Sequence, residues 1–393
     1  MQVGLVGAPN TGKSTFMKAV TLADVEINSY PFTTIEANRG VGYVTVPCPC
    51  EELNVSCDPN GKCVDGTRFV PVKMLDVAGL VPDAHEGRGL GNQFLDDLRE
   101  ADVLIHVLDV SGRTDAEGEP TEGYDPYENI EFLEKELDFW YKDIFKREWK
   151  KFSSSVEMED KDFEEQLLSR FSGLKIDRED IRKVVNKLEL DANSPGNWSE
   201  RAIESFATEL RKRTKPMIVA ANKIDLEGAE EKLKEVESKT EMDVIPCCAE
   251  VELALRKASN QSKVRYVPGV DSFEVLEEEG LSQEQAKALE FAEKILEEYG
   301  STGIQEVLNR AVFDLLDMIV VYPVENENNY TDKKGNVLPD AVLLERGSTA
   351  EDLAYEVHSD IGEEFIGAVD CRSGRKIGAD HTLENGDIIK ILT

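Results

Sequence analysis

Long apolar runs are scarce in this sequence of 393 residues. Its longest runs, VLIHVLDV and FDLLDMIVVYPV, fall well short of the ~20 apolar residues that a membrane-spanning helix needs. No positively charged stretch followed by an apolar one opens the chain, so we expect no secretory signal. These features predict a soluble, cytoplasmic protein without a membrane partner.

Histidine is rare as well, with four in the chain. The motifs G-x-S-x-G and H-E-x-x-H do not occur, so the sequence offers no basis for a hydrolase triad or a zinc-protease site. His106, inside VLIHVLDV, is predicted to be a histidine of a core strand. The seven cysteines lack the density and setting of a disulfide scaffold, which favours a reducing compartment.

Basic residues are few relative to acidic ones, 45 against 79, and the formal net charge is −34. A surface of this sign repels polyanions, so we expect no nonspecific binding to nucleic acid or to anionic membranes. Adaptation to a salt-rich cytoplasm and an ordinary acidic surface both explain the charge. The charge therefore identifies no partner.

A phosphate-binding motif stands near the start of the chain. Residues 7–14 read GAPNTGKS, match G-x-x-x-x-G-K-[ST], and lie between the apolar stretch 3–6 and a helix expected from Lys13. The glycines let backbone N–H groups face phosphate oxygens, and the helix N-terminus adds a partial positive charge. Lys13 would reach the β- and γ-phosphates, and the Ser14 hydroxyl would bind Mg²⁺. The predicted nucleotide-binding residues here are Gly7, Ala8, Pro9, Asn10, Thr11, Gly12, Lys13, Ser14 and Thr15.

Two further motifs follow apolar, strand-like stretches. In DVAG, Asp76 would hold Mg²⁺ through water and the Gly79 amide would contact the γ-phosphate, whereas an aspartate that merely caps the next segment is the alternative. In NKID, the Asp225 carboxylate can accept two hydrogen bonds from the guanine N1–H and 2-amino groups, which adenine cannot supply. Asn222 would steady the phosphate loop, and Lys223 would lie along the base.

These motifs, in this order, resemble those of a translation-factor-type GTPase. SYPFTTIEANRG and DVAGLVPDAHEGRGLGNQFLDDLREADVLIHVLD resemble the Obg family, and LLERGSTAEDLAYEVHSDI with GADHTLENGDIIKIL resembles a TGS domain. The combination is similar to archaeal members of the YchF branch and covers nearly the whole chain. The resemblance adds Cys248, Ala249 and Glu250 to the nucleotide-binding residues. Bacterial and eukaryotic relatives in that branch typically carry glutamate where Asp225 stands and prefer ATP, so this chain departs from them toward guanine.

The resemblance also implies a switch segment at YPFTT, for which a plain turn is the alternative. One threonine there, Thr34 in preference to Thr33, would bind Mg²⁺ through its hydroxyl and the γ-phosphate through its amide. The predicted magnesium ligands are thus Ser14, Thr34 and Asp76.

The group that places the attacking water is not apparent. Many GTPases use a glutamine directly after the D-x-x-G glycine, but this chain has Leu80 there. Either intrinsic turnover is slow or another group acts. The resemblance suggests K⁺, because Asn10 stands where potassium-dependent relatives use an asparagine ligand. His85 and Arg88 could place water or charge, with solvated loop residues as the alternative. The predicted catalytic residues are Lys13, Asn10, Thr34 and His85.

Cys48, Cys50, Cys57 and Cys63 lie in a turn-rich stretch, CPCEELNVSCDPNGKC. Four thiolates could close a tetrahedral zinc site and stabilise a loop that has little core of its own. Their spacing differs from the usual paired C-x₂₋₄-C knuckles. Unpaired small residues in a loop are therefore the favoured interpretation, with zinc as the alternative.

Alternating apolar and helical patterns predict an α/β, P-loop GTPase domain with a doubly wound, mostly parallel sheet, formed by residues 1–119 and 212–316. The nucleotide would bind at the carboxyl ends of its strands. Residues 120–211 form a helical insertion, because apolar residues from Ile130 to Ile144 recur every three and four positions. We expect its helices to pack on one another, and a docking arm for a partner is compatible with that packing.

Residues 317–393 alternate strand-like stretches with one helix, which a capping box at Ser348–Glu351 would open. This pattern predicts a β-grasp fold, the TGS architecture. Seven basic against sixteen acidic residues argue against a general electrostatic grip on RNA. A local basic patch remains open, made of Arg372, Arg375, Lys376 and His381.

The sequence thus favours a Mg²⁺-dependent GTPase that hydrolyses GTP to GDP and phosphate slowly without a partner or K⁺. The expected partner is the ribosome or a ribosome-associated RNA or protein, and a monomer is favoured. Two alternatives remain: an ATPase of the same branch, and a ribosome- or RNA-binding module with negligible hydrolysis.

Overall fold

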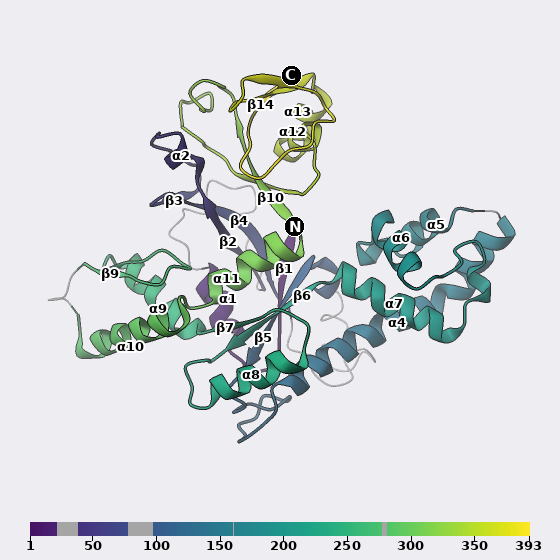
Figure 1. Cartoon of the computed structure of the whole chain (residues 1–393), viewed down its shortest axis with the longest axis horizontal. Coiled ribbons are helices and arrows are strands. Elements are labelled where there is room, and N and C mark those ends of the chain that lie inside the picture. Colours follow the sequence, from purple (N-terminus) through teal and green to yellow (C-terminus); the bar gives the residue numbers. More distant parts are fainter. Residues whose placement is uncertain (22–37, 78–96, 160, 277–280) are drawn as a thin grey trace.

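The computed structural model describes residues 1–21, 38–77, 97–159, 161–276 and 281–393. A mostly parallel sheet of order β2-β4-β1-β5-β6-β7 forms its centre, with β3 paired to the first part of β4 (Figure 1). β2 and β3 run antiparallel to β4, and the other neighbours are parallel. The bounds are β1 (Gln2–Val6), β2 (Arg39–Pro47), β3 (Lys62–Val64), β4 (Thr67–Asp76), β5 (Val103–Asp109), β6 (Met217–Asn222) and β7 (Val244–Cys247).

The central strands β5 and β6 are buried at every position, because apolar clusters cover both faces of the sheet. Their sequences, VLIHVLD and MIVAAN, are continuous apolar runs, as is typical of buried parallel strands. Burial lowers the pKa of His106 in β5 to about 4, so its imidazole stays neutral in the core. The prediction of a core-strand histidine is confirmed.

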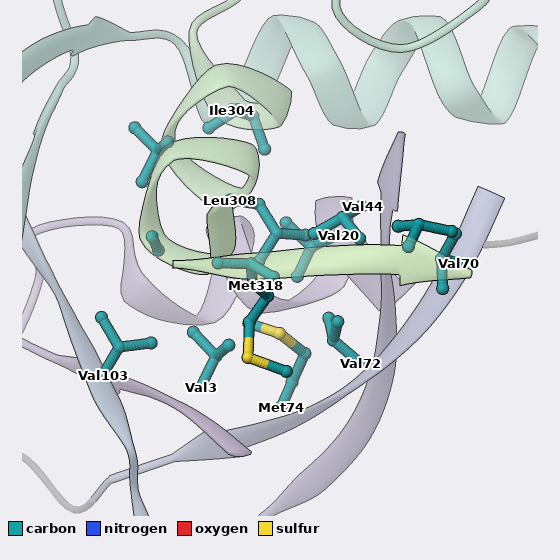
Figure 2. Packing of buried hydrophobic residues seen from close by; sticks show 14 of the residues in the cluster. Val3, Val20, Val44, Val70, Val72, Met74, Val103, Ile304, Leu308 and Met318 are labelled. Atoms are coloured by element: carbon teal, nitrogen blue, oxygen red, sulfur yellow. The ribbon is translucent and has the colours of Figure 1, made fainter. Parts of the chain in front are cut away.

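One face of the sheet packs against α1 (Lys13–Thr21) and α11 (Ile304–Arg310). Figure 2 shows Val72 and Met74 of β4 close to Leu308 of α11 and to Met318. A π-helical turn, Ala311–Leu315, connects α11 to the next domain. The other elements of this part are α2 (Pro49–Glu52), α8 (Ala229–Lys239), α9 (Ala249–Asn260), β8 (Val264–Arg265), β9 (Glu274–Val275) and α10 (Gln283–Tyr299).

A helical arm extends from one side of the sheet (Figure 1). It consists of α4 (Tyr127–Glu159), α5 (Phe163–Arg170), α6 (Arg178–Lys187) and α7 (Glu200–Thr214), with short 3₁₀ turns at Ser172–Leu174 and Pro195–Asn197. Asp177 caps α6, as expected, by accepting a hydrogen bond from the Asp180 N–H. The helices pack on one another around a cluster of aromatic rings, Phe145, Trp149, Phe152, Phe163, Phe171, Trp198 and Phe206.

Truncation of Phe206 should destabilise this arm. Its fully buried ring lies 5.3 Å from the Trp198 ring centroid, so Phe206→Ala should cost about 3–5 kcal/mol of unfolding free energy. The three tryptophans of the chain, Trp140, Trp149 and Trp198, all lie in the arm, so urea unfolding followed by tryptophan fluorescence reports on it. Phe139→Ala, at a ring 48% exposed, is the matched control and should change this free energy by less than about 0.5 kcal/mol. Equal effects of the two substitutions would contradict the role of the cluster.

The C-terminal domain is a five-stranded sheet of order β11-β10-β14-β12-β13. β10 and β14 are parallel, the other neighbours antiparallel, and α12 packs on the sheet, which is the predicted β-grasp arrangement. The capping box lies one residue later than expected, because Thr349 rather than Ser348 caps α12 and Asp352 completes the box. The bounds are β10 (Met318–Val324), β11 (Val342–Glu345), α12 (Ala350–Val357), α13 (Ser359–Glu363), β12 (Gly367–Asp370), β13 (Arg375–Ile377) and β14 (Ile388–Leu392).

None of the helices within the described ranges is both long enough and apolar enough to cross a membrane.

Candidate nucleotide-binding site

A cavity of about 480 Å³ lies at the carboxyl ends of β1 and β6, beside the N-terminus of α1. It brings together three segments that are far apart in the sequence, at the sheet edge where parallel α/β folds bind ligands. Leu226, which the sequence motifs do not single out, also lines it. The lining residues are Ala8, Pro9, Asn10, Gly12, Lys13, Ser14, Thr15, Asn222, Lys223, Asp225, Leu226, Ala249 and Glu250.

The glycines of the phosphate loop are required by close backbone approaches. Gly12 has φ +94°, and a Cβ there would lie 2.2 Å from Asn222 Nδ2. A Cβ on Gly7 would lie 2.4 Å from the Val107 carbonyl oxygen of β5. The loop therefore fits against β5 and β6 only without side chains at these positions. Thr11 is buried behind the cavity, where its hydroxyl donates to the Ala8 carbonyl at 3.0 Å.

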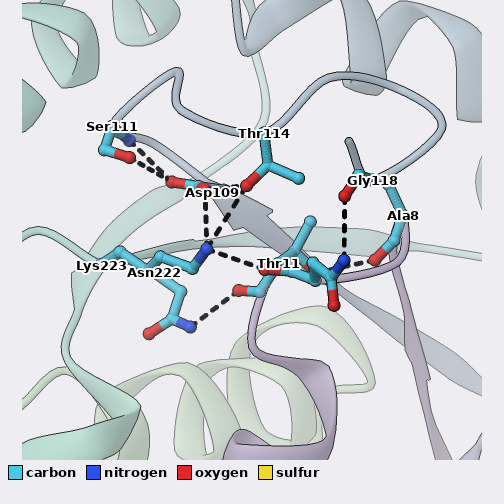
Figure 3. A network of polar contacts seen from close by, with 9 residues as sticks. Ala8, Thr11, Asp109, Ser111, Thr114, Gly118, Asn222 and Lys223 are labelled. Carbon is cyan, nitrogen blue, oxygen red and sulfur yellow. Dashed lines mark hydrogen bonds and ion pairs between the residues drawn. The ribbon is translucent and has the colours of Figure 1, made fainter. Parts of the chain in front are cut away.

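Asn222 joins the phosphate loop to the segment that begins α9. Its buried side chain donates through Nδ2 to the Thr11 carbonyl at 2.9 Å and accepts at Oδ1 from the Ala249 N–H at 3.0 Å (Figure 3 shows the first bond). One amide thus links residues 211 and 27 positions away in the sequence. These two bonds suit the expected role of Asn222, which is to hold the phosphate loop in place.

Asn222→Ala should lower the free energy of unfolding by about 2–4 kcal/mol, because it leaves two buried backbone groups without partners. Scanning calorimetry would show this as a lower melting temperature. Asn193→Ala, at an exposed loop position, is the control and should leave the transition unchanged. An unaltered transition for Asn222→Ala would show that these two bonds do not stabilise the loop.

The Lys223 side chain lines the cavity and contacts the phosphate loop. Its Nζ lies 2.7 Å from the Asn10 carbonyl and 2.7 Å from Oδ2 of Asp109, at the end of β5 (Figure 3). Asp109 also accepts hydrogen bonds from the Ser111 and Thr114 hydroxyls, both at 2.5 Å. Burial by itself would raise the pKa of Asp109, but hydrogen bonds from Lys223, Ser111 and Thr114 outweigh it and lower that pKa.

Asp109 was not among the residues predicted from the sequence. The available signal was an acidic residue at the end of an apolar strand whose neighbours carry the other motifs. Because Asp109 holds the Lys223 ammonium, the lysine methylenes are the part of this side chain left to lie along a base.

Asn10 is held by the loop that follows β5. Its Nδ2 donates to the Gly118 carbonyl at 2.9 Å (Figure 3), and a Cβ on Gly118 would lie 2.6 Å from Pro9. The side-chain oxygen is thus the atom of Asn10 that is suited to a monovalent cation.

Lys13, which lines the cavity, lies beside Asp76. Lys13 Nζ is 3.0 Å from Asp76 Oδ1 and also donates to the Val77 carbonyl. Asp76 is the last residue of β4, and Ser14 lies in the first turn of α1. A hydroxyl and a carboxylate are the hard oxygen ligands that Mg²⁺ prefers, so Ser14 and Asp76 fit this ion.

Asp225 lines the same cavity. Cys248 Sγ donates to Asp225 Oδ1 at 3.2 Å. Burial, followed by the nearby Asp225 charge, raises the pKa of the Cys248 thiol, which keeps it protonated as a donor. The cysteine thus orients the carboxylate, and Ala249 and Glu250 at the start of α9 line the cavity beside it.

Comparisons with known proteins agree with these motifs. Residues 2–140 match the family model of the 50S ribosome-binding GTPases, residues 220–326 the G4-motif domain of YGR210-like Obg-like GTPases, and residues 328–393 the TGS domain. A GTP-binding protein of Methanocaldococcus jannaschii is 49% identical over 393 residues, covering 100% of this chain and 98% of the relative. The chain belongs to the Obg family of GTPases, in the YchF-like branch.

Other members of this GTPase family extend the comparison. A GTP-binding protein of Schizosaccharomyces pombe is 35% identical, covering 90% of this chain and 89% of the relative. The ribosome-binding ATPase YchF of Haemophilus influenzae is 29% identical, covering 98% and 97%. The solved GTP-binding protein of Pyrococcus horikoshii superposes with a TM-score of 0.80 at 39% identity over 100% of both chains. The S. pombe YchF GTPase, at TM-score 0.59 and 19% identity over 100% and 97% of the chains, shows the fold alone.

Several predicted site residues lie outside the described part of the chain. They are Thr33, Thr34, Gly79, Leu80, His85 and Arg88. Their roles remain predictions.

Proposed function

We propose that this chain hydrolyses GTP to GDP and phosphate with Mg²⁺ and acts as a conformational switch in translation. The observation that carries the proposal is that Lys13, Ser14 and Asp225 line one and the same cavity. Phosphoryl transfer to water needs little covalent chemistry from the protein. Lys13 and the backbone N–H groups of the phosphate loop would stabilise the charge that develops on the γ-phosphate, with Mg²⁺ held by Ser14, Asp76 and Thr34.

Guanine selectivity follows from the Asp225 carboxylate. Guanine offers two adjacent N–H donors to it, and adenine would leave a carboxylate oxygen without its partner. The hydrogen bond from Cys248 orients this carboxylate, which lines the cavity. The competing function is ATP hydrolysis, because relatives that align over nearly the whole chain are named ribosome-binding ATPases.

Hydrolysis by the free protein should be slow, because Leu80 cannot orient water. We propose that K⁺ accelerates it by binding the side-chain oxygen of Asn10, where it would neutralise charge between the β- and γ-phosphates.

We propose the ribosome as the cytoplasmic partner, since the matching family model and several relatives carry ribosome-binding names. General attraction of the C-terminal domain to RNA is not expected from seven basic and sixteen acidic residues. Arg372, one of its four candidate RNA-binding residues, is paired with Glu52 of α2 and donates to the Gly386 carbonyl at 3.1 Å. A ribosomal contact would therefore be local. We propose that the chain engages it as a monomer.

Single-turnover hydrolysis tests these points together. Radiolabelled GTP or ATP would be followed in K⁺ and in Na⁺ at equal ionic strength, with and without ribosomes from the same organism. GTP cleavage that is faster in K⁺ and faster still with ribosomes supports the proposal, and Asn10→Ala should remove the difference between the two cations. Preferential cleavage of ATP would contradict the proposed GTP hydrolysis and show that the chain is an ATPase. GTP binding without ribosome-stimulated cleavage would leave a nucleotide-binding module.

A further inference from the structure

Four cysteines meet at the end of the central sheet opposite to the candidate nucleotide-binding cavity. Cys48 follows β2, Cys50 lies in α2, Cys57 lies in a coil and Cys63 lies in β3. All four Sγ atoms lie within 4.8 Å of one another, and Cys50 and Cys63 Sγ are 4.0 Å apart. Cys48 and Cys50 are buried, and the other two are half-buried. The favoured prediction from the sequence was that these cysteines are unpaired loop residues. In the structure they form one compact cluster.

The separation of the sulfurs matches a single tetrahedral ion. A Zn–S bond of about 2.3 Å places the sulfurs of a tetrahedral site about 3.8 Å apart. A disulfide requires about 2.05 Å between two sulfurs, which the separation of Cys50 and Cys63 does not approach. A multi-iron cluster needs wider spacing, because its cysteines surround a cage of several atoms. Four thiolates around one ion are typical of structural zinc.

A buried cation lies beside this cluster. Arg68, 1% exposed, pairs with Cys63 in the β3–β4 ladder, and its guanidinium lies 5.6 Å from the Tyr322 ring centroid. Its Nη2 donates to the Leu338 carbonyl, while its Nε is buried without a hydrogen-bond partner in the described structure. A buried charge is stable only with compensation. One Zn²⁺ with four thiolates carries a net charge of −2 and supplies that compensation.

The coil between Cys50 and Cys63 forms hydrogen bonds to the C-terminal domain. The Asp58 and Asn60 N–H groups donate to the Val337 and Pro339 carbonyls, both at 2.9 Å. The Asn60 side chain donates to Asp340 Oδ1 at 3.0 Å. Residues 53–61 contain no helix or strand, so fixing Cys50, Cys57 and Cys63 would restrict their backbone.

We propose that Cys48, Cys50, Cys57 and Cys63 bind one Zn²⁺ ion, and that this ion holds residues 53–61 in the shape on which the C-terminal domain docks. The metal is structural, because all four positions around it are filled by protein thiolates. It joins the GTPase domain to the TGS domain.

The nucleotide site should not depend on this ion. β2 and β4 form one antiparallel ladder. At one end of the ladder Arg39 pairs with Leu75, next to Asp76, and at the other end Pro47 pairs with Thr67, next to the cysteine cluster. At about 3.4 Å per residue, the nine residues of β2 separate the two ends by roughly 27 Å. Loss of zinc should therefore loosen domain docking and leave binding of a fluorescent GDP analogue intact.

Metal analysis of the full chain tests the proposal directly. Protein purified with a thiol reductant and without a metal-affinity tag should contain one zinc per chain by plasma mass spectrometry. Cys57→Ser and Cys63→Ser should lose it, while Cys371→Ser, at a buried cysteine in the same core cluster, should keep it. If the cluster variants do not fold, wild-type protein exchanged with Co²⁺ should show the intense visible absorption of a tetrahedral tetrathiolate site. Absence of stoichiometric metal together with absence of this spectrum would overturn the proposal.

Hydrogen exchange tests the docking role. After removal of zinc by a strong chelator under reducing conditions, amides of residues 53–61 should exchange faster, among them the Asp58 and Asn60 N–H groups that donate to the C-terminal domain. Amides of residues 7–15 and 222–226 should exchange as before. Unchanged exchange at Asp58 and Asn60 would overturn the link to the C-terminal domain, even if zinc is bound.

Discussion

Asp225→Asn is expected to weaken GTP binding about 10³-fold. It removes the negative charge from the hydrogen bond to guanine N1–H and abolishes the bond to the 2-amino group, and hydrogen bonds to a charged group are each worth about 1.5–3 kcal/mol. An asparagine oxygen can still accept from N1–H, but its NH₂ group faces the guanine 2-amino group, donor against donor. Xanthine has a carbonyl at that position, so XTP binding should rise as GTP binding falls. Isothermal titration of GTP, XTP and ATP would measure all three affinities.

This exchange of preference separates a base contact from general damage. A misfolded site would lose affinity for all three nucleotides. Loss of a specific guanine contact would instead lower the affinity for GTP and raise the affinity for XTP. Cys248→Ala is the companion variant, because it removes the 3.2 Å bond to Asp225 and keeps the carboxylate. It should weaken GTP binding only about tenfold, the equivalent of one modest hydrogen bond. Unchanged GTP affinity in Asp225→Asn would exclude Asp225 as the guanine acceptor.

Lys13→Met is expected to lower the rate of GTP cleavage about 10²- to 10³-fold, the usual cost of removing one donor that stabilises transition-state charge. The physical reason is that Lys13 belongs to the phosphate loop and lines the cavity, where its ammonium would meet the γ-phosphate of the bound GTP. Single-turnover cleavage at saturating GTP and K⁺ would measure the loss apart from any change in affinity.

Lys18→Met is the matched control for Lys13→Met. Lys18 lies on the same helix, is exposed and does not line the cavity. It removes the same charge from the same element and should leave cleavage unchanged. If both variants lost activity equally, the effect would come from the net charge of α1. If neither did, Lys13 would have no part in the transition state.

Much of the nucleotide site could be predicted because phosphate and base binding use residues that are contiguous in the chain. The phosphate loop needs glycines at fixed offsets before a helix start, and the structure places Gly7, Gly12 and Lys13 in such a turn. The fold of the C-terminal domain could likewise be predicted from its alternation of strand-like stretches and a helix. Its capping box lies one residue later than predicted, at Thr349. Such boundary shifts arise because Ser348 and Thr349 are both good caps.

A few adjacent residues were enough to predict the family and the phosphate loop, and they make Asp225 the expected guanine acceptor, since each depends on chemistry carried by neighbouring positions. Which distant groups meet follows from the fold. Asp109 reaches Lys223, 114 positions away, because β5 and β6 are neighbours in the sheet. The four cysteines converge, and meet the buried Arg68, because β2, β3 and β4 pair there. Such contacts follow from strand order and burial, which local patterns do not encode.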